Sequence, residues 1–205
     1  MSLTFMAVVV LIIGGSVTII SSDWRLCLIS LSLQYVAVAV LMVVEIIPEL
    51  GMVRLLAGLV AVLILAQSFK RASHYSRHAA HAKGKRTPSA GLFLRVAVVM
   101  LAAIISIGLA QSYPMPDFSP DITISAYWLV FSSVSSLVLS QEVSRVGFAL
   151  LMLELAASLV AGVMVETANL ARFLLSSLTS IVLALAVGYL VGLDRIAANP
   201  EEEKP

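Results

Sequence analysis

The chain has 205 residues, of which 60% are hydrophobic and 12% charged, and its mean hydropathy is +1.03. An ordinary soluble domain does not bury that share of apolar surface, so the composition predicts a membrane protein. The formal net charge of +1 gives no sign of a nucleic-acid partner. The single cysteine, Cys27, excludes a framework of internal disulfides.

Apolar runs follow one another along the whole chain. A span needs about 20 apolar residues to cross the hydrocarbon core, and it must be helical because lipid offers the backbone no hydrogen-bond partner. The runs cover residues 3–20, 25–46, 50–69, 92–112, 122–140, 145–165 and 170–193. The sequence therefore predicts an all-α membrane protein with seven transmembrane helices.

The first and third runs need separate comment. The first has no basic residue before it and no small-residue cleavage site after it, so we expect a retained span rather than a signal peptide. The third contains Arg54, whose side chain must either lie inside the helix or extend its charged head to the membrane surface.

A basic loop, residues 70–91, separates the third run from the fourth. Together with Arg95 it holds more than half of the 13 Lys and Arg residues. The positive-inside rule places this loop on the cytoplasmic side of the membrane, which we expect to be the cell inner membrane. The N-terminus is then outside, and the acidic tail, residues 194–205, is in the cytoplasm.

Three histidines in this loop, His74, His78 and His81, would share one face if the segment were helical. Such a face suits a metal ion or acidic lipid headgroups. No carboxylate or thiol accompanies the histidines, so we favour a solvated linker that sets the topology, with no metal site.

The second and sixth runs resemble each other. When Arg25 is aligned with Arg145, Gln34 falls opposite Glu154, and Arg54 and Arg172 follow early in the next runs. Residues 1–69 and 122–193 are therefore predicted to form two parallel three-helix repeats. Residues 92–121, a linker helix and an outer loop, let the second repeat enter the membrane in the same direction as the first. The alternative is chance similarity between apolar helices.

Glu154 interrupts the sixth apolar run. At a rise of 1.5 Å per residue it lies about 13 Å beyond Arg145, near the middle of the bilayer. An ionised side chain costs at least about 3 kcal/mol there, and intramembrane charges usually mark ion pathways. We therefore expect Glu154 to face another helix and to relay protons. The alternative is a protonated Glu154 that only hydrogen-bonds a neighbouring helix.

Two features carry a resemblance to a known family: the spacing of Arg25 and Gln34, and the "LLMLE" segment that ends at Glu154 and follows Arg145. With these features the chain resembles hydrogenase-4 component E, a relative of the K subunit of respiratory complex I and of the C subunit of multisubunit sodium/proton antiporters. The resemblance covers nearly the whole chain and implies a membrane subunit that contributes to H⁺ or Na⁺ translocation.

The chain departs from that family in one respect. The related subunits carry a second membrane acid in the region that here contains Leu178 and Thr179. A proton route would therefore depend on Glu154 and Gln34. The expected accessory polar residues are Ser177, Thr179, Ser180, Arg54 and Arg172.

The resemblance also implies antiporter-like and other membrane subunits as partners in a complex-I-like or group 4 hydrogenase assembly. The sequence has no CxxC, dinucleotide-binding or haem-binding motif. Iron–sulfur clusters or other redox centres are thus expected in the partners, and this chain is expected to be non-catalytic. A structural scaffold or a stand-alone transporter of small solutes remains an alternative.

Overall fold

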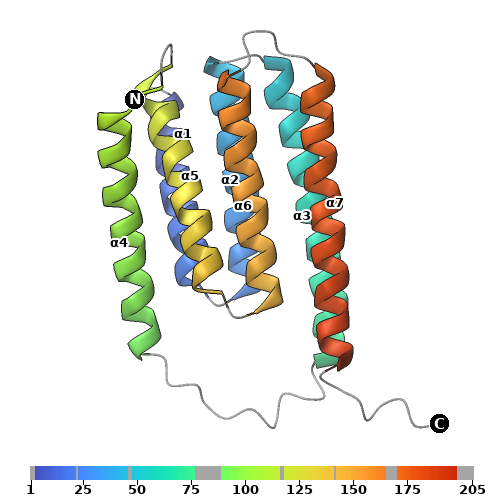
Figure 1. Cartoon of the computed structure of the whole chain (residues 1–205). Coiled ribbons are helices and arrows are strands. Elements are labelled where there is room, and N and C mark those ends of the chain that lie inside the picture. Colours follow the sequence, from blue (N-terminus) through green and yellow to red (C-terminus); the bar gives the residue numbers. More distant parts are fainter. Residues whose placement is uncertain are drawn as a thin grey trace, which may run out of the picture.

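The structure, a computed structural model, describes residues 3–21, 23–45, 48–76, 89–115, 118–140, 142–164 and 170–197. Within these ranges the regular structure is entirely helical, and seven helices are long and apolar enough to cross a membrane. The helices are α1 (Leu3–Ile20), α2 (Trp24–Glu45), α3 (Pro48–Ser76), α4 (Ser89–Ser112), α5 (Pro120–Val138), α6 (Val143–Met164) and α7 (Leu170–Ala197) (Figure 1). The predictions of an all-helical fold and of seven helices long and apolar enough to span a membrane are confirmed for the described residues.

The helix ends follow local chemistry. Pro48 and Pro120 stand at the first positions of α3 and α5, where the missing N–H of proline costs nothing. Asp23 precedes α2, and its carboxylate Oδ1 accepts a hydrogen bond of 3.0 Å from the backbone N–H of Arg25. These signals fix the ends more sharply than the hydropathy of the runs does.

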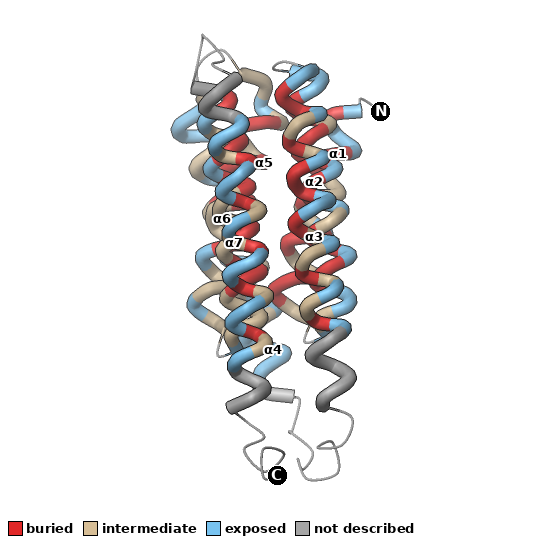
Figure 2. Tube along the Cα trace, turned by 90° about the vertical axis from the view of Figure 1, so that its right-hand side faces the viewer, coloured by how far each residue is buried: buried red, intermediate tan, exposed pale blue. Residues whose placement is uncertain are grey.

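The helices form two layers with one helix added at the side. One layer holds α1, α2 and α3, and the other holds α5, α6 and α7 (Figures 1 and 2). Across the layers α1 packs on α5, α2 on α6 and α3 on α7, while α4 lies beside α5 and α1. This neighbour pattern is compatible with two parallel repeats, and the superposition of the two halves stays a prediction.

Burial is concentrated between the two layers. Leu31, Val38, Leu151 and Leu155 are fully buried there. The outward-facing residues are also apolar, and on the helices other than α4 they alternate with buried ones (Figure 2). Apolar side chains on both the inside and the outside suit a bundle surrounded by lipid, because such a bundle has no water-facing side along its span.

Candidate functional site

The carboxylate of Glu154 on α6 is paired with the guanidinium of Arg54 on α3. The pair is bidentate: Nη1 of Arg54 donates to Oε1 of Glu154 at 2.8 Å, and Nη2 donates to Oε2. Arg54 is completely buried and the side chain of Glu154 is 12% exposed. Of the two positions expected for Arg54, the structure therefore shows the one inside the bundle. Glu154 faces other helices, as predicted.

Two serines of α7 complete the surroundings of the carboxylate. Ser176 donates to Oε1 of Glu154 at 3.2 Å, and Ser180 donates to Oε2 at 2.7 Å. Ser180 also accepts a hydrogen bond of 2.9 Å from Nη1 of Arg54. Each carboxylate oxygen thus accepts two hydrogen bonds, and the charge joins α3, α6 and α7.

The spacing of these serines explains why they act together. Ser176 and Ser180 are one helical turn apart and so point from the same face of α7. Ser177 is buried and hydrogen-bonds none of the described residues. Thr179 is exposed, and its hydroxyl donates to the carbonyl of Leu175 at 2.9 Å. Of the three hydroxyl neighbours predicted for Glu154, the structure therefore places only Ser180 on it.

Tyr35 of α2 lies against the other side of Arg54. The guanidinium carbon of Arg54 is 5.5 Å from the centre of the Tyr35 ring, which is a cation–π distance. Gly58 follows Arg54 by one turn of α3 and makes room for this ring. A Cβ atom at Gly58 would overlap Cδ1 and Cγ of Tyr35, so no side chain fits there unless the ring moves.

Protonation and pairing are coupled at this site. A proton on Glu154 would remove the negative charge that balances Arg54 and leave a buried guanidinium unpaired. A guanidinium keeps its own proton in proteins, so Arg54 cannot become neutral. Proton uptake by Glu154 therefore requires Arg54 to move or to find another anion.

Gln34 belongs to a different polar cluster, between α1 and α2. Its Nε2 donates to Thr18 at 3.4 Å and to Ser30 at 3.3 Å, and Ser30 donates to the carbonyl of Gly14 at 2.5 Å. Among the described residues none hydrogen-bonds its Oε1, and none links it to Glu154. A relay that includes both Gln34 and Glu154 would need a further group between them.

Other predicted residues lie outside what the structure describes. The backbone of Arg172 is part of α7, but its side chain is not described. The same holds for the side chain of His74, and His78 and His81 are outside the described ranges altogether. In the ranges that are described, no group of three or more His, Cys, Asp or Glu side chains is placed to hold a metal ion.

Three features of the site were missed from the sequence: the Arg54–Glu154 pair, Ser176 and Tyr35. The pair had a usable signal, because buried charges of opposite sign in one bundle tend to find each other. The i, i+4 spacing of Ser176 and Ser180 was a second signal. Nothing in the sequence indicated that Tyr35 belongs to this site, apart from its position next to Gln34.

The chain matches no protein-family model, no curated protein and no solved structure.

Proposed function

We propose that this chain is an integral membrane subunit of a complex-I-like or group 4 hydrogenase-type respiratory assembly, and that Glu154 contributes to moving H⁺ or Na⁺ across the membrane. The observation that supports this best is the Arg54–Glu154 pair inside a bundle of seven apolar helices. Keeping two charges there is costly, and intramembrane ionisable groups usually belong to ion pathways.

The pair would act as a gate. When it is closed, the carboxylate is held by Arg54, Ser176 and Ser180. A proton arriving at Glu154 would release Arg54, while the serines continue to hydrogen-bond the neutral acid. Loss of that proton to the other side would close the pair again. A sodium ion, which also binds carboxylate and hydroxyl oxygens, could replace the proton in this exchange.

The other parts of the proposal concern the assembly. Two parallel three-helix repeats, α1–α3 and α5–α7, joined by α4, would give the subunit its internal symmetry. The redox centres, iron–sulfur clusters among them, would lie in partner subunits, and antiporter-like subunits would adjoin this one in the inner membrane. Its N-terminus would be outside and its C-terminus in the cytoplasm.

A second candidate function is a structural scaffold. It is favoured by the complete saturation of the Glu154 carboxylate, which accepts four hydrogen bonds from α3 and α7. In this alternative the only role of the pair is to hold three helices in register. In that case it never needs to open.

The two candidates are separated by removing both charges together. In the variant Arg54→Met/Glu154→Gln, neither charge is left unpaired, and the new side-chain amide on α6 can still hydrogen-bond the serines. If Glu154 relays ions, the purified assembly should form but pump at least about tenfold more slowly, measured with a pH-sensitive dye in vesicles. Arg25→Gln, which removes an exposed charge, is the control. Pumping at the wild-type rate by the assembled double variant would rule out the relay and favour the scaffold.

A further inference from the structure

A cleft opens between α4, α5 and α6 at the end of the bundle where α1 and α5 finish and α4 and α6 begin. Its volume is about 420 Å³. Two arginines line it, Arg95 of α4 and Arg145 of α6, and its walls include Leu94 and the end of α5 at Val138 and Leu139. The cleft is separate from the Arg54–Glu154 site: the described residues that line the cleft include none of the residues that surround that pair.

The two arginines are held close together by the end of α1. Arg95 donates from Nη1 to the carbonyl of Ile20 at 3.1 Å, and Arg145 donates from Nη2 to the carbonyl of Ser21 at 3.1 Å. Because these carbonyls belong to consecutive residues, two guanidinium groups are brought to one side of the cleft.

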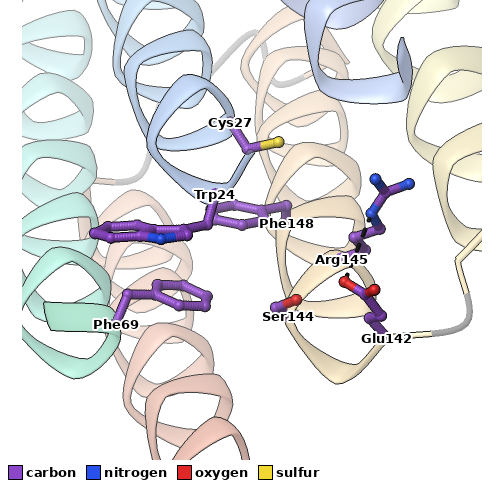
Figure 3. A pocket seen from close by; sticks show the side chains of 7 residues that line it. All are labelled: Trp24, Cys27, Phe69, Glu142, Ser144, Arg145 and Phe148. Carbon is purple, nitrogen blue, oxygen red and sulfur yellow. Dashed lines mark ion pairs between the residues drawn. The ribbon is translucent and has the colours of Figure 1, made fainter. Parts of the chain in front are cut away.

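One carboxylate lies among the residues that line the cleft. It belongs to Glu142, whose side chain is 53% exposed and whose Oε2 lies 3.9 Å from Nε of Arg145. Figure 3 draws this ion pair as part of a neighbouring pocket. In that pocket Trp24 and Phe148 each stack on Phe69, with ring centroids 5.5 Å apart (Figure 3). Among the described residues that line the cleft, two side chains are cationic and one is anionic, so this lining carries a net positive charge.

The entrance to the cleft is apolar and faces lipid. Val138 is 79% exposed and Leu94 is 55% exposed, and α4 is the least covered of the seven helices. Arg95 lies near the start of the apolar span Gly91–Ser112 of α4, so its long side chain can hold the charged head at the level of the lipid headgroups. A ligand of this cleft therefore meets positive charge at one end and apolar side chains at the other.

We propose that the cleft binds an anionic phospholipid. Its phosphate oxygens accept hydrogen bonds from Arg95 and Arg145, whose planar donor groups match phosphate geometry, and its acyl chains lie along Leu94 and Val138. The membrane itself supplies this ligand, because the cleft is open to the lipid side. The proposal does not depend on ion translocation by Glu154.

The test compares lipid binding by the purified full chain in detergent. Phosphatidylglycerol and phosphatidylcholine are titrated, and bound lipid is counted by native mass spectrometry. The wild-type chain should bind phosphatidylglycerol at least about tenfold more tightly than phosphatidylcholine, and Arg95→Gln and Arg145→Gln should each lose most of that preference. Arg25→Gln, which removes a charge at the same end of the bundle outside the cleft, should keep it.

A second pair of variants leaves the arginines untouched. Gly91 lines the cleft from α4, and a Cβ atom added there would meet no atom within 4 Å, so Gly91→Trp can introduce a bulky side chain at the cleft without a clash at its Cβ. Gly108 on the same helix is equally open and does not line the cleft. Gly91→Trp should weaken phosphatidylglycerol binding about tenfold or more, and Gly108→Trp should not.

Three results would overturn the proposal. The first is that Gly91→Trp, Arg95→Gln and Arg145→Gln all bind phosphatidylglycerol as tightly as the wild-type chain does. The second is an equal loss in the controls Arg25→Gln and Gly108→Trp, which would show general attraction to a charged or apolar surface. The third is release of the lipid by inorganic phosphate at matched ionic strength, which would show that the cleft takes a free anion.

Discussion

The two charges of the buried pair respond differently when the partner is removed. Without Arg54, Glu154 can take up a proton, become neutral and still hydrogen-bond Ser176 and Ser180. Without Glu154, Arg54 stays charged because a guanidinium does not lose its proton in proteins. Removing Glu154 should therefore destabilise the fold more than removing Arg54 does.

This asymmetry predicts an order of stability. Glu154→Gln strands the Arg54 charge and should lower the free energy of unfolding by about 3–5 kcal/mol, the usual cost of breaking a buried pair. Arg54→Met should cost less, and the double variant should recover most of the loss caused by Glu154→Gln. Thermal unfolding of the four purified chains in detergent gives the order. Equal losses in the two single variants would contradict this account.

The sequence identified Glu154 as a charge inside an apolar helix, and it suggested that a buried cation would pair with it, but it did not say which one. A carboxylate in an apolar run is conspicuous, and its depth follows from the helical rise. Arg54 is 100 residues away, and no local pattern connects the two. Gln34 was placed with Glu154 by aligning two helices, but hydrogen bonding depends on which neighbours a helix faces, and Gln34 faces α1.

At the scale of elements, the approach of α2 to α3 depends on one missing side chain. Gly58 lets the Tyr35 ring lie against α3 next to Arg54. Gly58→Ala should force the helices apart or push the ring off the guanidinium, at a cost of about 1–3 kcal/mol, typical of overpacking. Thermal unfolding in detergent measures this loss.

Two controls define that prediction. Gly108→Ala on α4 meets no neighbouring atom and should leave the unfolding midpoint at or slightly above the wild-type value. In a Tyr35→Ala background, Gly58→Ala should lose the part of its effect that comes from the ring, while the contact with Cβ of residue 35 at 2.9 Å remains. An undiminished effect in that background would mean that the Tyr35 ring does not cause the loss.

The elements themselves were largely predictable. Hydropathy located every helix, since a lipid-crossing segment must be both apolar and about 20 residues long. The ends were less predictable: α3 runs on to Ser76, beyond the apolar run that stops at Phe69. Lys, Arg and Ala continue a helix readily, so the helix does not end where it leaves the apolar layer.

At the scale of the whole molecule, the described helices place Ser89 and Ser119 near opposite ends of the bundle, at the start of α4 and just before α5. Cysteines introduced at these positions should react with a membrane-impermeant reagent from opposite sides, with position 89 reacting from the cytoplasm. The natural Cys27 is buried and should give little background in the unmodified chain. Reaction of both positions from one side would contradict the seven-span arrangement.

The layered packing was the least predictable feature at this scale. Hairpin connections explain why neighbours in sequence pack together, but they do not say which helix of the first layer meets which helix of the second. The contact between α3 and α7 brings Arg54 to Ser180. The contact between α2 and α6 joins the central helices of the two layers. The burial of charge contributes to this choice, because Arg54 and Glu154 are satisfied only when α3, α6 and α7 meet.

The 100-residue separation of the pair also has a consequence for the order of synthesis. Translation proceeds at about 5–20 residues per second, so α3 would enter the membrane roughly 5–20 s before Glu154 is made. During this interval Arg54 lacks the Glu154 carboxylate, so we expect α3 to wait at the insertion machinery or to sit shallowly with its arginine at the surface. Final insertion of the third span would then depend on the arrival of the sixth and seventh, and a chain released early would expose an unfinished helix to quality-control proteases.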